Sequence, residues 1–230
     1  MDNVGFRVLP AVRKVSEELI DQYRSFVTPH ISDNMNRLNA VDASIRPIHQ
    51  AGKLAGHAFT VKTRPGDNLM IHKAIDLAGP GDVIVVDGGG SVNNALIGEI
   101  MVRIAMKRGI EGFVIDGAVR DSTEIRDLNY PVYAKGITHR GPYKDGPGEI
   151  NVPVQIGGVV VFPGDIVVGD MDGIAVVPSD QAVSLVEKIQ TKRKSELETM
   201  REIENGTLDR SWVDETLRQK GCQGIEFRAN

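Results

Sequence analysis

Hydrophobic and polar positions recur with different periods along the chain, and each period predicts a type of element. Apolar residues three or four positions apart over residues 14–27 indicate an amphipathic helix that ends at Thr28-Pro29. A second short helix, capped by a serine, is expected over 32–38. From Leu54 the pattern changes to partial alternation, which is typical of a strand.

The middle of the chain alternates between helix-like and strand-like segments. In order, they are a helix that stops at Gly79-Pro80-Gly81, a strand over 82–87, a helix over 92–108, a strand over 112–116, a helix over 121–129 and a strand over 131–135. This alternation predicts parallel βαβ units. After residue 156, three β-rich runs separated by tight turns predict a compact antiparallel or mixed sheet. We therefore expect an α/β protein with one main domain and helical arms at both ends.

Composition and charge exclude several classes of function. A net charge of −4, with basic residues scattered among acids, argues against nucleic acid as a partner. The apolar runs are too short to span a membrane, and the first ten residues lack the pattern of a secretory signal. The single cysteine, Cys222, can form no internal disulfide. A cytoplasmic enzyme or binding protein is expected.

The first candidate site is the segment DGGGSVNNALIGEIM, residues 87–101. Asp87 ends a predicted strand, the three glycines permit a tight turn, and Ser91 could cap the following helix. Free backbone N–H groups at such a turn can bind an anion, but a purely structural turn explains the glycines equally well. Glu99 stands four residues before Arg103, and a helix-surface ion pair is the favoured explanation of that spacing.

The second candidate is FVIDGAVRDSTEIRD, residues 113–127, where charges crowd the end of a predicted strand. Asp121 and Glu124 have the spacing of a helix-capping pair, which would leave Asp116 and Arg120 unexplained. In open parallel sheets, ligands bind beyond the carboxyl ends of the strands, so this segment and the first candidate should lie side by side. There a carboxylate can hold a hard divalent cation, and an arginine can bind a substrate carboxylate.

Other motifs carry less information. Glu196 lies on the apolar face of a long helix predicted over about 180–204, so it needs a partner: Arg193 on the same helix, a site, or a neighbouring subunit. The five histidines lack the spacing of a zinc site. The motifs of elbow-type serine hydrolases and of P-loop nucleotidases are absent from the sequence.

Four segments together resemble the family named for the regulator of ribonuclease activity A. They are PGDNLMIHKAI, DGGGSVNNALIGEIM, GFVIDGAVRDSTEI and GEINVPVQIGGVVVFPGDIVVGDMDGIAVVP. The chain most resembles the catalytic branch, the 4-hydroxy-4-methyl-2-oxoglutarate and 4-carboxy-4-hydroxy-2-oxoadipate aldolases, over roughly residues 30–205. The resemblance implies an αββα sandwich with mixed sheets, within one catalytic domain over 1–205 followed by an extension over 206–230. It also implies a homotrimer, or a homohexamer built as a dimer of trimers, with sites between subunits.

The resemblance assigns roles to individual residues. It implies that Asp121 holds Mg²⁺ or Mn²⁺ largely through waters, and that Arg120 binds the pyruvyl part of a 2-oxo acid substrate. It places the substrate on the backbone amides of Gly98, Glu99, Ile100 and Met101. Lys144 and Glu196 match a lysine and a glutamate that an adjacent subunit contributes.

The chemistry implied is cleavage of 4-hydroxy-2-oxo acids, and decarboxylation of oxaloacetate, through pyruvate enolate. A water held by Asp121 and by Glu99 or Glu196 is the expected base. The alternatives are a non-catalytic regulator that binds a ribonuclease, and metal-assisted hydrolysis without release of pyruvate. Because regulators of this family typically lack the aspartate of the Arg-Asp pair, the intact pair here favours an enzyme.

Overall fold

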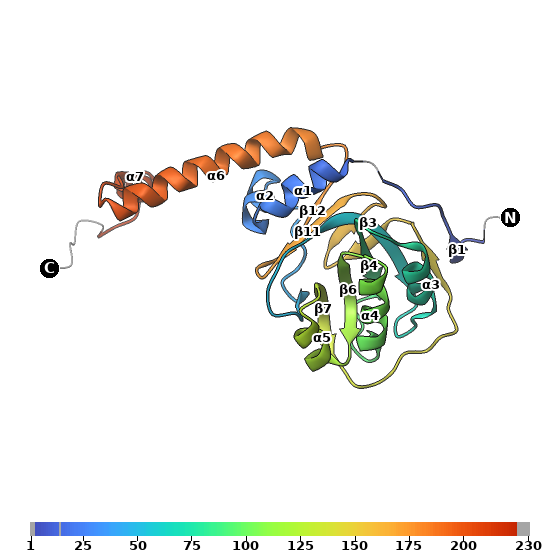
Figure 1. Ribbon diagram of the computed structural model, residues 1–230. Coiled ribbons are helices and arrows are strands. Elements are labelled where there is room, and N and C mark those ends of the chain that lie inside the picture. Colours follow the sequence, from blue (N-terminus) through green and yellow to red (C-terminus); the bar gives the residue numbers. More distant parts are fainter. Residues whose placement is uncertain (1–2, 14, 225–230) are drawn as a thin grey trace. The chain divides into compact units, whose positions relative to one another are not determined.

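The computed structural model describes residues 3–13 and 15–224 of the 230-residue chain. The chain divides into two compact units, Met1–Ile189 and Gln190–Asn230. The first unit is a mixed α/β structure, as the sequence predicts (Figure 1). Among the residues described, no helix is both long enough and apolar enough to cross a bilayer.

The first unit is built around a ten-stranded mixed sheet in which seven strands follow the order β1-β8-β3-β4-β6-β7-β2. Antiparallel β11 and β12 extend it from β3, β5 pairs with β6, and β9 and β10 form a separate hairpin. The strands are β1 (Phe6–Val8), β2 (Arg46–Pro47), β3 (Leu54–Thr63), β4 (Asp82–Asp87), β5 (Ala95–Ile97), β6 (Gly112–Val119), β7 (Val132–Ile137), β8 (Gly148–Ile150), β9 (Val154–Ile156), β10 (Val159–Val161), β11 (Ile166–Asp170) and β12 (Gly173–Val177).

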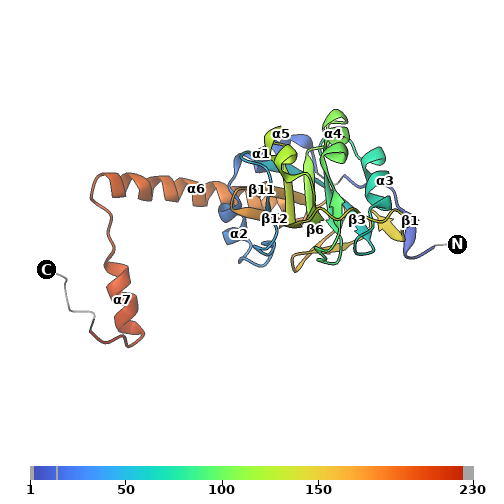
Figure 2. The ribbon, with the colours of Figure 1, turned by 90° about the horizontal axis from the view of Figure 1, so that it is seen from below.

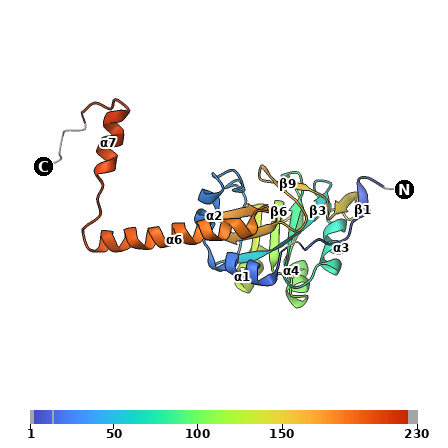
Figure 3. The same cartoon turned by 90° about the horizontal axis from the view of Figure 1, so that it is seen from above.

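Helices cover the sheet on both sides. The helices of the first unit are α1 (Glu17–Ser25), α2 (Thr28–Asn34), α3 (Leu69–Leu77), α4 (Glu99–Lys107), α5 (Ser122–Leu128) and the first turns of α6 (Ala182–Glu204), whereas α7 (Ser211–Gln219) belongs to the second unit. In Figures 2 and 3, α3 and α4 lie along one face of the central strands, and the chain after β8 crosses the other face. Strands β3, β4 and β6 are nearly all buried because both of their faces are covered, whereas β7 is buried only over residues 132–134.

Three hydrophobic clusters define four layers. The first cluster packs α3, α4 and α5 against the central strands, with Phe113 and Ile84 at its centre. The second, around Val85 and Val176, fills the space between the central strands and the later β segments. The third, around Ile20 and Ile166, packs α1, α2 and the start of α6 on β11 and β12. This order is the αββα sandwich that the family resemblance implied.

Several predicted boundaries were wrong for local reasons. Pro29 does not end a helix; it lies in the first turn of α2, where proline is favoured because its missing N–H has no intrahelical partner. The helix expected over 92–108 begins only at Glu99, because Ala95–Ile97 pairs with β6 as a strand. Ser91 therefore does not cap that helix, whose N-cap residue is Gly98. In the predicted helix over 14–27, residue 14 lies outside the described part.

The second unit contains most of α6, and α7. The first turns of α6 belong to the first unit and bury Leu185 and Ile189. Helix α7 has no buried residue among those described, and Trp212 is 63% exposed. The end of the predicted extension, residues 225–230, lies outside the described residues.

Candidate active site

A cavity of about 270 Å³ lies where the first turns of α3 and α4 approach the end of β6 and the loop that precedes β8. It is lined by residues from these four places and from β5: Asn68, His72, Leu96, Ile97, Gly98, Ile100, Met101, Arg120, Gly141, Pro142 and Lys144. Five of the eleven belong to the substrate-binding set that the family resemblance implied. Glu99, the sixth of that set, does not line the cavity.

The sheet brings the two candidate segments together. Strands β4 and β6 pair in parallel with Asp87 opposite Asp116, so their carboxyl ends lie at one edge, as predicted. Strand β5 then pairs with the extended end of β6, and the Arg120 N–H donates to the Ile97 carbonyl at 3.0 Å. This backbone hydrogen bond holds Arg120 beside the residue that begins α4.

Asp121 occupies a left-handed backbone conformation, with φ of 55° and ψ of 42°, between β6 and α5. Its side chain makes no capping hydrogen bond to α5, so the predicted capping pair with Glu124 does not form. Instead, Asp121 Oδ2 accepts the Glu99 N–H at 3.0 Å and caps α4. Glu124 is exposed on α5. The left-handed turn therefore directs this carboxylate to the start of α4 rather than along its own helix, and Asp121 is not among the residues that line the cavity.

Arg120 and Asp121 form a loose pair. Arg120 Nε lies 3.7 Å from Asp121 Oδ2, and both side chains are partly exposed. That distance exceeds a hydrogen bond, so the guanidinium keeps donors available for another anion. The second cation of the cavity is Lys144. An anionic ligand is therefore favoured by two side-chain charges and by the amino-terminal end of α4.

Glu99 is engaged elsewhere. Its Oε1 accepts from Arg103 Nε at 2.7 Å, which is the surface ion pair that the spacing favoured. The backbone N–H of Glu99 is the part of this residue that contacts Asp121. Because its carboxylate forms this ion pair, the structure gives no support to Glu99 as a holder of the catalytic water.

The loop that carries Lys144 is fixed by a buried carboxylate. Asp67 is fully buried, and its Oδ2 accepts the N–H groups of Asp145 at 2.8 Å and Gly146 at 2.9 Å. Its Oδ1 accepts the Leu69 N–H at 3.0 Å, at the start of α3. Burial raises the pKa of Asp67, but these hydrogen bonds and the one from Arg64 outweigh burial, so the pKa is lowered overall.

Six residues of the cavity were not predicted from the sequence, and two of them, Asn68 and His72, have polar side chains. The histidines were considered only for metal-ligand spacing, and none stood out. His72 is half-buried on α3, and burial lowers its pKa, with Lys144 adding to the effect and Asp76 opposing it. A histidine with a perturbed pKa in a cleft is a functional-site signal, but the environment that perturbs it is visible only in the fold.

Asp116 does not join this cavity. Neighbouring residues of a strand point to opposite faces, and Asp116 lies on the same face as Val114. Its Oδ2 accepts the Gly157 N–H at 3.2 Å, and its Oδ1 lies 3.7 Å from Lys135 Nζ. Together with Asp87 it lines a different polar hollow. The expectation that all four charges of the 113–127 segment crowd one place was therefore wrong.

Glu196 lies on α6 in the second unit and pairs with Lys192, Oε1 to Nζ 3.4 Å. The sequence suggested Arg193 as a partner of Glu196 on the same helix. The structure shows an ion pair with Lys192, which lies four residues before Glu196 and therefore on the same side of the helix. The side chain of Glu196 is 41% exposed. Whether it reaches a site of a neighbouring subunit stays a prediction.

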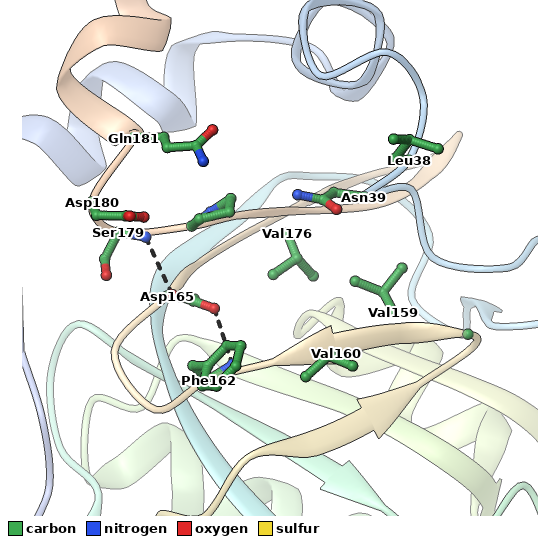
Figure 4. A pocket seen from close by; sticks show the side chains of 12 residues that line it. Leu38, Asn39, Val159, Val160, Phe162, Asp165, Val176, Ser179, Asp180 and Gln181 are labelled. Carbon is green, nitrogen blue, oxygen red and sulfur yellow. Dashed lines mark hydrogen bonds between the residues drawn. The ribbon is translucent and has the colours of Figure 1, made fainter.

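A larger cavity of the first unit lies elsewhere. It measures about 730 Å³ and lies between the β10 region and the end of β12, with Leu38 at one rim (Figure 4). Asp165 projects into this region, and its carboxylate accepts the N–H groups of Phe162 at 2.9 Å and Ser179 at 3.2 Å. None of the predicted site residues lines it. The described chain also lacks any group of three or more metal-ligating side chains arranged to hold an ion.

Comparison with known proteins identifies relatives along most of the chain. The family model described as RraA-like, aldolase/RraA, matches residues 28–176. A relative from Halalkalibacterium halodurans, provisionally named 4-hydroxy-4-methyl-2-oxoglutarate aldolase, is 38% identical over 191 residues, covering 83% of this chain and 91% of the relative. A 4-hydroxy-4-methyl-2-oxoglutarate aldolase of Thermus thermophilus is 34% identical over 151 residues, covering 66% of this chain and 92% of its own length.

A solved structure shares the fold. Streptomyces coelicolor RraAS2, described as an unusual member of the RNase ES inhibitor RraA protein family, superimposes with a TM-score of 0.76 at 27% identity. The match covers 83% of this chain and 99% of that protein. Relatives with enzyme names and relatives with inhibitor names therefore share this architecture, so the fold alone does not select the function.

Proposed function

Because this chain belongs to the RraA-like family, we propose that it is a divalent-metal-dependent carbon–carbon lyase that cleaves 4-hydroxy-2-oxo acids to pyruvate. By the same chemistry it would decarboxylate oxaloacetate. The observation that carries the proposal is the Arg120-Asp121 pair: Arg120 lines a cationic cavity, and the neighbouring Asp121 carboxylate accepts the first N–H of α4. Relatives named as aldolases support the lyase class.

The cavity suits a small 2-oxo acid. Its volume of about 270 Å³ holds only a small molecule, and Arg120 and Lys144 supply positive charge from different walls. The N–H groups of Ile100 and Met101 lie in the first turn of α4, where backbone donors have no intrahelical acceptor. A carboxylate bound there would receive both fixed charge and backbone hydrogen bonds.

Asp121 fits the role of a lone metal-binding carboxylate. Its Oδ2 holds the α4 N–H, while Oδ1 makes no hydrogen bond among the residues described. Mg²⁺ commonly keeps several waters and takes only one or two protein carboxylates, so a single aspartate is sufficient. Mg²⁺ or Mn²⁺ bound there would polarise the keto oxygen as a Lewis acid.

Arg120 would stabilise the charge that develops during the reaction. Cleaving the C3–C4 bond of a 4-hydroxy-2-oxo acid, or losing CO₂ from oxaloacetate, leaves pyruvate enolate. A guanidinium held in place before the reaction stabilises that enolate more than it stabilises the neutral ketone. Removing one such contact typically costs about 10²–10³ in turnover.

Pyruvate release from oxaloacetate and from 4-hydroxy-4-methyl-2-oxoglutarate tests the proposal. The parent and Asp121→Ala would be assayed with Mg²⁺, with Mn²⁺ and with chelator. We expect metal-dependent pyruvate from the parent and none from Asp121→Ala. Asp121→Asn is the matched control, because its amide oxygen can still accept the Glu99 N–H and preserve the α4 cap.

Three outcomes would contradict the proposal. Near-normal turnover by Asp121→Ala would remove the metal-ligand role. No pyruvate from either compound under any metal, combined with stoichiometric recovery of a ribonuclease in a pull-down, would establish the regulator instead. Release of an acid or alcohol without pyruvate would indicate metal-assisted hydrolysis.

A further inference from the structure

The side chains that line the cavity include few that can accept a proton. Arg120 and Lys144 are donors in their ordinary charged forms, and Leu96, Ile97 and Ile100 are hydrocarbon. Only the amide oxygen of Asn68 and the imidazole of His72 remain as good acceptors in the described lining. An amide oxygen is not a base in water, so His72 is the one lining side chain that can take up a proton near neutral pH.

His72 is placed and poised for this role. It projects from α3, one turn after Asn68, and its ring makes no hydrogen bond to another described residue. Burial and then the Lys144 charge lower its pKa, while Asp76 raises it. Its neutral form, which has one free ring nitrogen, therefore predominates at neutral pH.

Asn68 gives an independent sign that this wall binds a ligand. Asn68 is 2% exposed, and its Nδ2 donates to the Leu96 carbonyl at 2.9 Å. Its Oδ1 is buried and has no hydrogen-bond partner in the described chain. A buried acceptor without a donor is costly, so the site favours a ligand with a hydroxyl group. The single proton of a substrate 4-hydroxyl is the one that the step below transfers to His72, so a water or another donor bound with the substrate would satisfy Asn68 Oδ1.

The carboxylates near the cavity are committed to other contacts. Glu99 is paired with Arg103, and Asp121 caps α4 and is assigned to the metal. The expected water held by these two groups therefore has weaker support than a side chain that faces the cavity directly. Glu196 belongs to the second unit, and its predicted role is a contribution from a neighbouring subunit.

We propose that His72 is the proton acceptor for the substrate 4-hydroxyl; the proposal rests on the lyase function above. The O–H bond breaks with its proton moving to the free ring nitrogen, and its electron pair forms the carbonyl of the departing 2-oxo acid. The C3–C4 electron pair becomes the enolate of pyruvate. The imidazolium then returns the proton to C3, so no external oxidant or reductant is needed.

The test compares two reactions in His72→Gln. Gln keeps polarity and similar length but cannot titrate. We expect aldol cleavage to fall about 10²–10⁴-fold and the acidic limb of its kcat/KM profile, below about pH 6.5, to disappear. Release of CO₂ from oxaloacetate has no hydroxyl proton to remove, so it should fall less than about tenfold by the same reasoning.

Asp76→Asn tests whether the acidic limb reports on His72, because the pH of that limb would not change if His72 had only a structural role. Asp76 is exposed on α3, four residues after His72 and outside the lining of the cavity. Removing its charge removes an influence that raises the His72 pKa, so the acidic limb should move to lower pH. Turnover at neutral pH should stay at the parental value.

The outcomes separate this proposal from the lyase function. If the parent releases pyruvate and His72→Gln retains both the rate and the acidic limb, His72 is not the acceptor and the lyase function stands. Equal losses of both reactions in His72→Gln would indicate a role in binding or packing, and would also overturn the proposal. If the parent releases no pyruvate from either compound, both proposals fail.

Discussion

Gly98 shows how closely the residues of this cavity approach one another. A side chain at this position would contact the Asp121 carboxylate, and its Cβ would lie 2.9 Å from Arg120 Cγ. Only glycine allows α4 to begin directly against the Arg-Asp pair. The same absence of a side chain lets the Glu99 N–H reach Asp121.

Gly98→Ala should therefore reduce lyase turnover about 10²-fold, because displacing catalytic groups by about 1 Å has that effect. Gly79→Ala is the matched control, since a methyl group there would meet no atom within 4 Å. Steady-state kinetics of the two variants, with a thermal melt of each, make the comparison. Parental activity in Gly98→Ala would show that the Arg-Asp geometry is not critical.

Arg120→Lys tests whether the guanidinium fork matters beyond its charge. Lysine keeps the positive charge but loses bidentate binding, so we expect kcat/KM to fall about 10²–10³-fold. Arg103→Lys is the control, because it alters an exposed ion pair of α4 and should remain near parental activity. Similar kinetics for Arg120→Lys and the parent would refute the assigned role.

At the scale of elements, Asp67 joins the start of α3 to the loop that carries Lys144. Three backbone N–H groups converge on this buried carboxylate. The pKa of Asp67 is lowered in the folded protein. Its ionised form therefore contributes stability that is fully present above the unfolded-state pKa, near 4, and is lost as the pH falls through the folded-state pKa.

Asp67→Asn should lower the free energy of unfolding at pH 7 by about 2–3 kcal/mol, since hydrogen bonds to a buried charge are lost. The difference from the parent should shrink in acid below about pH 4. Denaturant unfolding at pH 7 and pH 3 measures both effects. The control, Asp145→Asn, alters a side chain that is 76% exposed and should change stability little. A constant difference across pH would contradict the linkage.

At the scale of the whole molecule, the surface of α4 supports the predicted homo-oligomer. Ile100 is 70% exposed and Ile104, one turn later on the same face, is 42% exposed, on the helix that begins at the cavity. Apolar side chains grouped in this way commonly mark a protein–protein interface. A trimer with sites between subunits, as the family resemblance implies, would bring Glu196 of a neighbouring subunit to each site, whereas Lys144 already lines the cavity of its own chain.

Mixed oligomers test the shared site directly. Asp121→Ala and Glu196→Ala protomers would be unfolded together in equal amounts, refolded and assayed. If each site takes Asp121 from one subunit and Glu196 from the next, random assembly should leave both residues intact in about one quarter of the sites. Neither variant alone should show this activity. No recovery in the mixture, with oligomers confirmed by light scattering, would assign Glu196 to its ion pair with Lys192 and not to a site.

The sequence by itself determined the α/β class, most of the central elements and the Arg120-Asp121 pair. These depend on local periodicity and on the order of strands along the chain, which are properties of sequence. Local propensity did not predict that Ala95–Ile97 pairs with β6 or that Pro29 lies at the start of a helix. Both outcomes are set by neighbours that are distant in sequence or by the geometry of a helix terminus.

Tertiary structure alone decided which charged and polar groups share the cavity. Asp116 lies only four residues from Arg120, and regular alternation along a strand would place both side chains on one face. The register of β6 shifts in this stretch, however, and the two residues line different hollows. The capping role of Asp121 depends on its left-handed turn and on the distant start of α4. His72 gains its altered pKa from burial and from Lys144, 72 residues away, and no pattern near either residue encodes that contact. Distances in space, and the burial that accompanies them, set the chemistry of these groups.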